Sequence, residues 1–380
     1  MALAKGSKSG LSYKEESAWG TFATGNFAGL AFVSETLAEQ INKVQSAEIR
    51  PDRTKPAIRG GNVAAGGGVT TDLGCDRFGI FLKHLLTCVP VTTPLEAADI
   101  TALAVGAKVR GDLVKSNNKF YLCTLGGTLT TASPALTHTE GVAELDGVKF
   151  EYLCADSETV YSTVFTGGTT MPTGGLSFEK SVKGGDADMF VQFRGGRVDS
   201  LDLTIPQEGA VQAAWNLLFK DSVKSSSSGA GTVAYIAEEP VTGYEAFISF
   251  NAGQTTRPVR SASLKIGNSL EADVYCVGER TRREIPEKDR ECSGSLDVYF
   301  QDSTEYDIFK NETVVNTQIS FNRKGEFLKF EFPETKFTGS GTPQIAGSGV
   351  VTAKLEMSVF RQTAAYDVRV TMISLASALR

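Results

Sequence analysis

Two stretches of this 380-residue chain concentrate charged side chains, and their chemistry favours contact with another surface over catalysis. The denser stretch, Glu279 to Glu291, interleaves both signs around Pro286, and the other runs from Arg50 to Arg59. Mixed charges fix the register of an interface more than they add to its affinity. In an isolated protein, a solvated hairpin tip would be the better explanation. The candidate contact residues are Arg50, Asp52, Arg53, Arg59, Arg280, Arg282, Arg283, Glu287, Lys288 and Asp289.

Few residues offer the chemistry of an active site or a metal centre. His84 and His138 are the only histidines in the sequence, too few for a histidine relay or a zinc cluster. Asp186 and Asp188 form a D-x-D pair, but two carboxylates without further oxygen ligands make a weak cation site. The glycine-rich run 60–68 lacks the lysine of a phosphate-binding loop, and no G-x-S-x-G motif occurs. The sequence therefore predicts no enzyme, no cofactor and no metal.

An internal repeat is the strongest organisational signal. Residues 46–86 read as a strand, a charged loop, a return strand and an apolar helix, and residues 269–310 present the same order. Residues 176–203 follow the first unit as residues 319–345 follow the second. One long internal period indicates two copies of a domain, as in parts of symmetric or pseudo-symmetric assemblies. Chance likeness between two β-rich stretches with polar turns is the open alternative.

Composition indicates a globular, mainly β protein. The chain is 41% hydrophobic and 22% charged, with 39 glycines and 12 prolines, which favours short strands joined by tight turns. A single core stops growing at roughly 250–300 residues, so two or three domains are expected. The formal net charge of −6 disfavours tight capture of DNA, because that affinity comes from Lys and Arg.

The sequence also bears on the compartment. No apolar signal region follows the N-terminal residues, and no run reaches the roughly 18 apolar residues of a membrane span. Six cysteines lie far apart without a C-x-x-C pair, which predicts reduced thiols in a cytosol. We therefore expect no membrane insertion.

The repeat and the turn residues set the expected domain boundaries. We expect an N-terminal arm at 1–32, a first domain at 33–89 and 156–222, a flexible linker at 223–231 and a second domain at 232–380. The run RFGIFLKHLLT (77–87) predicts a helix, and AVQAAWNLLFK (210–220) favours a strand. Glycines 60, 61 and 66–68 are expected to break regular pairing. Residues 90–155 lack a counterpart in the second copy and predict a domain inserted into a surface loop.

Four motifs carry a resemblance that covers nearly the whole chain apart from the insertion. ESAWGTF at 16–22, SAEIRPDR at 46–53, SASLKIGN at 261–268 and GSLDVYF at 294–300 resemble the tail tube proteins of long-tailed bacteriophages. The resemblance implies two tandem β-sandwich or barrel domains, each with a flanking helix, whose strands join those of neighbours into a wide inner barrel. Stacked rings would then form a tube through which the genome leaves, and both charged loops would contact an adjacent subunit or ring.

That resemblance also implies partners and a location. Copies of the same chain, other tail proteins and transient genomic DNA are the expected partners, in a virion tail assembled in the cytoplasm of a bacterial host. Two domains per chain favour a trimeric, pseudo-hexameric ring, with a hexamer of chains as the alternative. An acidic balance suits a conduit that must release DNA.

The insertion resembles the small chitin-binding modules of chitinases in GDLV at 111–114, KFYLC at 119–123 and DGVKFEY at 146–152. Phe150 stands where those modules usually carry Trp. The resemblance implies possible sugar contact by Tyr121, Phe150 and Tyr152, although aromatic residues at alternating strand positions more often belong to a core. It motivates the alternative function, a carbohydrate-binding surface or adhesion protein; a hydrolase lacks the necessary acid, base and nucleophile.

Overall fold

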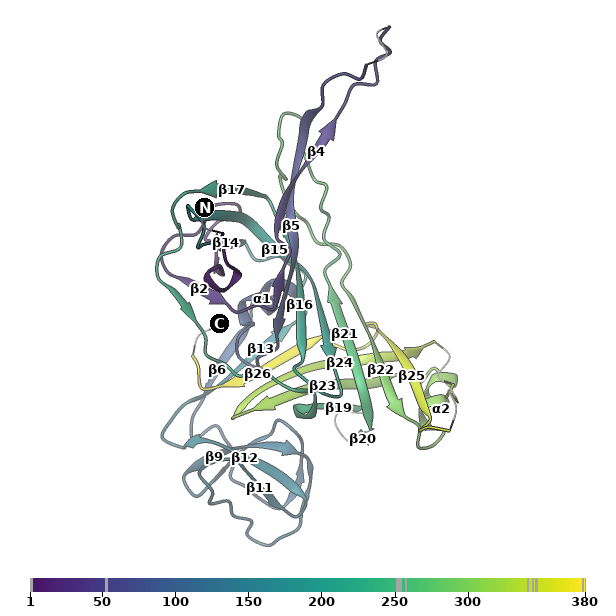
Figure 1. Ribbon diagram of the computed structural model, residues 1–380. Coiled ribbons are helices and arrows are strands. Elements are labelled where there is room, and N and C mark those ends of the chain that lie inside the picture. Colours follow the sequence, from purple (N-terminus) through teal and green to yellow (C-terminus); the bar gives the residue numbers. More distant parts are fainter. Residues whose placement is uncertain are drawn as a thin grey trace.

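A computed structural model describes residues 3–379 apart from 52, 53, 251–254, 257, 340, 341, 344, 346, 347 and 378. The chain folds into packed β-sheets with two short helices (Figure 1). The expected mainly β class is therefore confirmed. The two helices are α1 (Gly79–Leu85) and α2 (Thr304–Lys310), both where the sequence predicted them, and single 3₁₀ turns occur at η1 (Gly6–Lys8) and η2 (Gly243–Glu245).

One antiparallel sheet, here called the junction sheet, contains strands from both halves of the sequence. Its order is β5–β16–β15–β21–β22–β25, and β3 and β4 pair with the outer side of β5. The predicted strand at 210–220 is confirmed as β16. The strands are β3 (Ser34–Glu35), β4 (Ala38–Val44), β5 (Arg59–Asp72), β15 (Met189–Ile205), β16 (Gln212–Phe219), β21 (Val259–Gly267), β22 (Glu291–Tyr299) and β25 (Thr352–Val359).

A second layer covers the apolar face of the junction sheet. In the first half its order is β17–β15–β14–β1–β2–β18, using the N-terminal part of β15. In the second half the order is β6–β13–β26–β24–β23–β19–β20. The remaining bounds are β1 (Gly10–Glu15), β2 (Phe27–Leu30), β6 (Val91–Leu95), β13 (Val160–Thr166), β14 (Leu176–Val182), β17 (Asp221–Ser225), β18 (Val233–Tyr235), β19 (Ala246–Phe250), β20 (Thr255–Thr256), β23 (Val315–Arg323), β24 (Glu326–Thr338) and β26 (Arg369–Ser374).

The two halves share one pattern of strand pairing. In the first half β5 pairs with β16 and β16 with β15, whose N-terminal part pairs with β14 and β17. In the second half β22 pairs with β25 and β25 with β24, whose N-terminal part pairs with β23 and β26. The same order of partners in both halves supports the repeat seen in the sequence.

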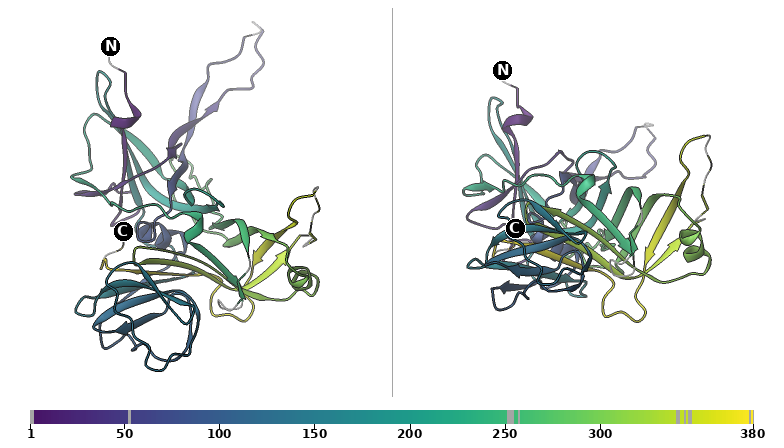
Figure 2. Two further views of the ribbon diagram at one scale, coloured as in Figure 1. Left: turned by 60° about the horizontal axis from the view of Figure 1, so that its bottom comes forward. Right: turned by 90° about the horizontal axis from the view of Figure 1, so that it is seen from below.

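The inserted segment forms sheets of its own below the second layer (Figures 1 and 2). One sheet has the order β8–β9–β12–β11, and β7 pairs with β10. Their bounds are β7 (Gly106–Lys108), β8 (Leu113–Ser116), β9 (Lys119–Leu125), β10 (Gly127–Leu129), β11 (Val142–Leu145) and β12 (Val148–Ala155).

Two expectations about local structure were wrong. The N-terminal arm contains β1, which lies between β14 and β2 with Leu11 and Tyr13 buried, because its alternating apolar residues fit the first core. The linker is not a free joint, since Ser222–Ser225 pairs with β15 and the Glu179 carboxylate accepts hydrogen bonds from Ser228 and Gly229. Glycines 60–68 do not end β5, but the register of its pairing with β4 shifts between Gly60 and Val63, as the sequence predicted.

Gly67 nevertheless marks an irregular point along β5. Its φ is +146°, and a Cβ there would lie 2.5 Å from the backbone oxygen of Thr36. Only glycine fits this close approach, which occurs where the neighbouring strand changes from β3 to β4. The glycine run thus serves a shift between partner strands within a continuous β5.

The halves share one continuous hydrophobic core. Trp215 on β16 packs against Phe78 and Phe81 around α1, with ring centroids 5.2 and 5.1 Å apart. The same buried cluster continues into the second half through Leu264 and Leu355. The expectation of separate cores is therefore not met, because the sheet that joins the halves also joins their apolar layers.

A charged cluster attaches β1 to α1 and gives a test of this packing. The Glu15 carboxylate accepts hydrogen bonds from Lys83 (2.7 Å) and the buried His84 (3.1 Å), and the His84 bond is the main cause that lowers the Glu15 pKa to about 2. A carboxyl with a depressed pKa stabilises the fold above its usual pKa of 4.5, and this contribution is lost as the pH falls toward 2.

We therefore expect Glu15→Gln to lower the free energy of unfolding at pH 7 and to flatten its dependence on pH between about 4.5 and 2. Urea denaturation across this pH range, on wild type and variant, measures both effects. Glu48→Gln, at an exposed position, is the matched control. Parallel pH profiles for wild type and Glu15→Gln would contradict the assigned role.

Candidate functional site: a polar sheet face and two loops

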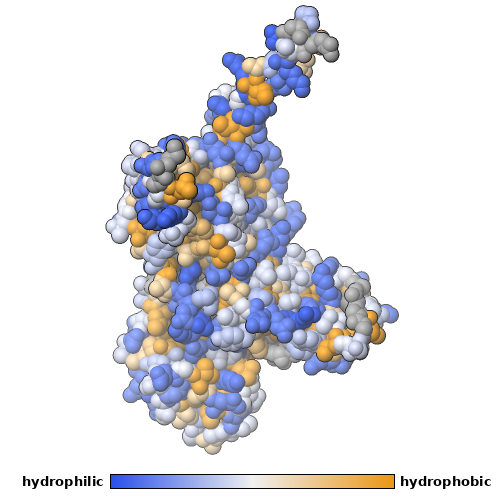
Figure 3. Space-filling model, viewed as in Figure 1, coloured by the Kyte–Doolittle hydropathy of each residue, from blue (hydrophilic) through white to orange (hydrophobic). Residues whose placement is uncertain are grey.

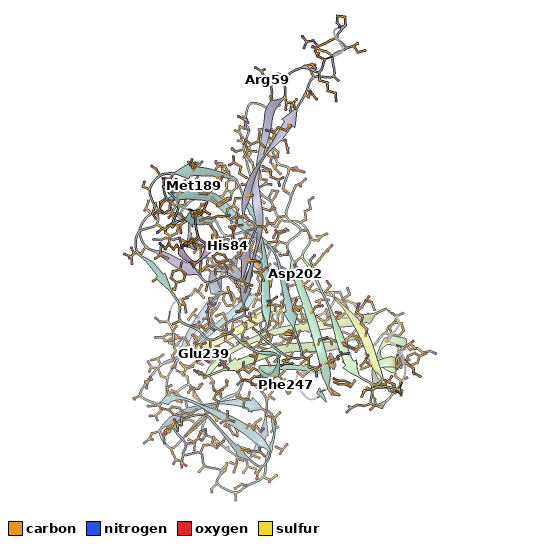
Figure 4. All side chains as sticks on the ribbon, viewed as in Figure 1. Arg59, His84, Met189, Asp202, Glu239 and Phe247 are labelled. Atoms are coloured by element: carbon orange, nitrogen blue, oxygen red, sulfur yellow. The ribbon has the colours of Figure 1, made fainter. Side chains whose placement is uncertain are left out.

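The junction sheet has one apolar and one polar face. Residues directly opposite in an antiparallel register share a face, so the pairings define rows across all six strands. One polar row contains Asp72, Gln212, Thr204, Ser263, Ser295 and Glu356. The next contains Thr70, Ala214, Asp202, Lys265, Ser293 and Ser358. Asp202 lies near the centre of this sheet (Figure 4).

Small hydroxyl side chains and a slight acidic excess characterise this polar face. The carboxylates are Asp72, Asp202, Glu291, Asp297 and Glu356, and the cations are Arg260, Lys265 and Lys354. Arg260 lies 3.7 Å from Asp297, and Lys265 lies opposite Asp202 in the register. The face therefore offers no run of unpaired cations that would hold a polyanion.

The second charged loop, residues 268–290, lies on the first half of the same chain. Arg282 is buried, and its guanidinium donates 2.6 Å hydrogen bonds to the backbone oxygens of Ala65, Phe219 and Ala272. Tyr275 Oη donates to the Val63 oxygen at 3.0 Å. The loop is therefore attached to β5 and β16 by bonds to main-chain oxygens.

The base of this loop is attached to the end of α1. Arg290 forms an ion pair with Asp367 (3.0 Å) and donates to the oxygens of Leu86 and Gly168. The Asn268 side-chain amide donates to the Val198 oxygen at 3.0 Å. A cation at the C-terminal end of a helix also interacts favourably with the helix dipole.

The other predicted contact residues of this loop lie at or near its surface. Arg280 Nε donates to the Gly61 oxygen at 3.0 Å, and Arg283 forms an exposed pair with Glu279. Lys288 lies 3.7 Å from Glu271, Glu287 is half-buried, and Asp289 is exposed. These residues remain candidates for contact with a neighbour. Arg282 differs, because its side chain is used inside the chain.

The first charged loop projects beyond the body of the molecule on the β4–β5 hairpin (Figure 1). Arg50 and Arg59 are exposed, whereas the predicted contact residues Asp52 and Arg53 lie outside the described residues. Apolar side chains are exposed along the hairpin, as its orange atoms show in Figure 3: Ile41, Val44, Ile49 and Ile58. These exposed apolar side chains on a projecting hairpin are candidates for contact with a neighbour.

The aromatic residues considered for sugar contact mostly face inward. Tyr121 and Phe150 are fully buried in the core of the inserted domain, and Tyr121 Oη donates to the His138 oxygen at 2.9 Å. Tyr152 is half-buried and packs edge-on against Tyr121. These contacts are those of a small hydrophobic core.

Sequence reasoning did not identify the polar face or the internal role of Arg282. Strand alternation showed which residues would face away from the core, but only the register shows that they line up across both halves. Within the described residues, no group of three or more His, Cys, Asp or Glu side chains is placed to hold a metal. No helix in the described part of the chain is long and apolar enough to cross a membrane.

A continuous sheet with one polar face, together with projecting charged loops, defines a mainly β protein without the residue groupings of a metal centre among its described residues. The comparison with family models makes this specific, since the phage tail tube protein family matches residues 6–359. The chain belongs to the phage tail tube protein family, whose members are structural proteins of the virion tail. A comparison with curated proteins found no match. The likeness of the insertion to chitin-binding modules stays a prediction.

The placement of Arg282 changes what its substitution should do. Reversing the charge at Arg282 would place a carboxylate among buried main-chain oxygens. We expect Arg282→Met to lower the free energy of unfolding by about 3 kcal/mol, because hydrogen bonds to charged groups contribute roughly 1.5–3 kcal/mol each.

Arg283→Met is the matched control, because the Arg283 side chain is 64% exposed and forms a surface pair worth about 1 kcal/mol at most. Denaturant titration of the unassembled chain measures both variants. Equal losses of stability would show that Arg282 does not anchor the loop.

Proposed function

We propose that this protein self-assembles into stacked rings that form the hollow tail tube through which phage DNA passes. The observation that carries the proposal is the pairing of β15 with β21, from Ser200↔Gly267 to Ile205↔Ala262. This ladder joins two halves with the same strand pattern into one sheet. A similar ladder between chains would extend the sheet laterally.

Both ends of the junction sheet leave strand edges available for such pairing. At one end, Thr352–Leu355 of β25 pair with β22, and no described strand pairs with them on the other side. At the opposite end, β3 and β4 pair with β5 alone among the described strands. Closure into a barrel removes edges that would otherwise aggregate.

A ring of three chains follows from the repeat. Three chains would supply six halves and alternate junctions within and between chains, giving a pseudo-hexameric ring. A hexamer of chains is the competing arrangement, and it would place twelve halves around a wider pore.

The charged loops supply contacts between copies. The second loop lies on the neighbouring half within the chain through Arg282 and Tyr275. The first loop, on the projecting hairpin with Arg50 and Arg59, would lie in the same manner on the next copy or the next ring. The exposed Arg280, Arg283, Lys288 and Asp289, together with the half-buried Glu287, would add contacts between copies.

The polar face of the junction sheet would line the lumen. Its serine and threonine hydroxyls carry no charge, and its acidic excess would repel phosphate, so DNA would not be held during transit. Assembly would take place in the cytoplasm of the host, and other tail proteins would bind the ends of the tube. The buried Tyr121 and Phe150 give no support to a carbohydrate-binding function.

Electron microscopy of the purified chain tests the assembly directly. We expect hollow tubes or stacked discs that form without added nucleic acid. Replacing Thr352 with Pro should abolish them, because proline removes a donor and is not tolerated inside a sheet. Pro at Val350, an exposed residue before β25, is the control. Monodisperse single chains of the wild type would contradict the proposal.

DNA passage is tested by reversing charge on the proposed lumen. Virions assembled with Asp202→Lys and Glu356→Lys should form normal tubes but release DNA several-fold more slowly, since a charge pair 4 Å apart in water interacts by about 1 kcal/mol. Added salt should restore the rate by screening. Glu144→Lys, 57% exposed on β11 of the insertion, is the control. An unchanged release rate would show that the polar face does not line the lumen.

A further inference from the structure

The inserted domain departs from the first half in sequence but is attached to the second half in space. Its entering strand β6 and leaving strand β13 extend the outer sheet of the second half, because β13 pairs with β26 from Tyr161↔Ser374 to Thr166↔Arg369. Figures 1 and 2 show these strands beside β26, with the inserted sheets beyond them. A peripheral ornament on a surface loop would need no such pairing.

Arg110 of the inserted domain reaches into the second half. Its Nε donates to Ser320 Oγ at 2.9 Å and one Nη donates to the Glu245 oxygen at 3.2 Å, and the guanidinium also bonds to Asn322 Oδ1. The guanidinium lies 4.9 Å from the centroid of the Phe247 ring, labelled in Figure 4. Burial lowers the pKa of Arg110 to about 10, which keeps the group charged at neutral pH.

A second polar contact fixes the turn between β23 and β24. The Glu151 carboxylate accepts a hydrogen bond from the Asn322 amide and another from the Gly325 backbone N–H, both at 3.1 Å. Gly325 has φ +82°, and a Cβ there would lie 2.9 Å from a Leu153 methyl carbon. The turn is thus shaped to receive the inserted domain.

Apolar side chains fill the space around these bonds. Ile100, Phe120 and Leu122 of the insertion form one buried cluster with Phe327 and Ile373 of the second half. Buried aromatic and aliphatic side chains dominate the energy of an interface. Together with Arg110 and Glu151, they make the insertion an integral part of the second half.

We propose that the inserted domain is a brace that fixes the two halves of one chain as a single rigid body. In the sequence, the insertion follows α1 and precedes β14, which both belong to the first half. Its contacts, however, lie on β19, β23, β24 and β26 of the second half. Rotation of one half against the other would therefore break the β13–β26 ladder, the Arg110 bonds and the apolar cluster together.

The brace also makes the junctions of the proposed ring unequal, and this consequence rests on the proposed function. At the corresponding place in the second half, only residues 311–314 separate α2 from β23, which leaves no segment to brace the next chain. A three-chain ring therefore contains three braced junctions within chains and three unbraced junctions between chains. The tube would therefore bend and dissociate at the unbraced junctions between chains.

The test measures the full, unassembled chain, so its outcome does not depend on whether tubes form. Spin labels at Val223→Cys on β17 and Lys310→Cys on α2, in a Cys276→Ser background, report the distance between the halves. Wild type should give one narrow distance distribution. Arg110→Met combined with Glu151→Gln should broaden it and should accelerate amide exchange in β13 and β26 at least about tenfold, given the strength of charged hydrogen bonds.

Glu144→Lys on the exposed side of the insertion is the matched control and should change neither measurement. A second variant, with residues 99–156 replaced by a short Gly-Ser linker that keeps β6 and β13, should broaden the distribution further. If both variants keep the narrow distance distribution and the wild-type exchange of β26, the insertion is a decoration and the proposal fails. Normal tubes with altered bending stiffness would support the unequal junctions.

Discussion

The antiparallel ladder between β15 and β21 is the constraint on which the other features depend. Because its side-chain period is two, one register places Leu201 and Leu203 toward the core and Asp202 and Thr204 toward solvent. A slip by one residue would bury the acidic face and expose the core. The ladder therefore determines at once the continuity of the sheet, the shared core of the halves and the character of the polar surface.

Three arginines hold the surrounding parts in place by the same chemistry. Arg282 attaches the second loop to β5 and β16, Arg290 attaches its base to the end of α1, and Arg110 attaches the insertion to η2 and β23. Arg282 bonds to main-chain oxygens, whereas Arg290 also pairs with the Asp367 carboxylate and Arg110 also bonds to the side chains of Ser320 and Asn322. Arginine suits this use because its rigid donors remain charged when buried.

Much of the fold could be predicted from the sequence, because local signals determine it. The helical spacing of Phe78, Phe81 and Leu85 gave α1, and the alternation in Trp215 and Leu217 gave β16. The glycine run 60–68 was predicted to break regular pairing, and it holds both the register shift between Gly60 and Val63 and the change of partner strand at Gly67, although β5 continues through it. The arm and the linker were misjudged because β1 and β17 are stabilised by strands distant in sequence.

The candidate site was less predictable, for a physical reason. The density of charged residues identified both loops. It does not show that the Arg282 guanidinium bonds to three backbone oxygens, two of them on strands distant in sequence. The polar rows likewise arise from register between strands far apart in sequence, such as Asp202 opposite Lys265. The repeat was visible because it preserves the order of elements, which the strand pairing of the two halves reproduces.

The most direct test of this account is a cryo-electron microscopy reconstruction of the assembled tube at a resolution that shows the backbone. The account predicts three chains per ring, backbone pairing between the β25 edge of one copy and the β3–β4 edge of the next, and Asp202 facing the pore. Rings whose chains touch through side chains alone, or with Asp202 on the outer surface, would contradict it.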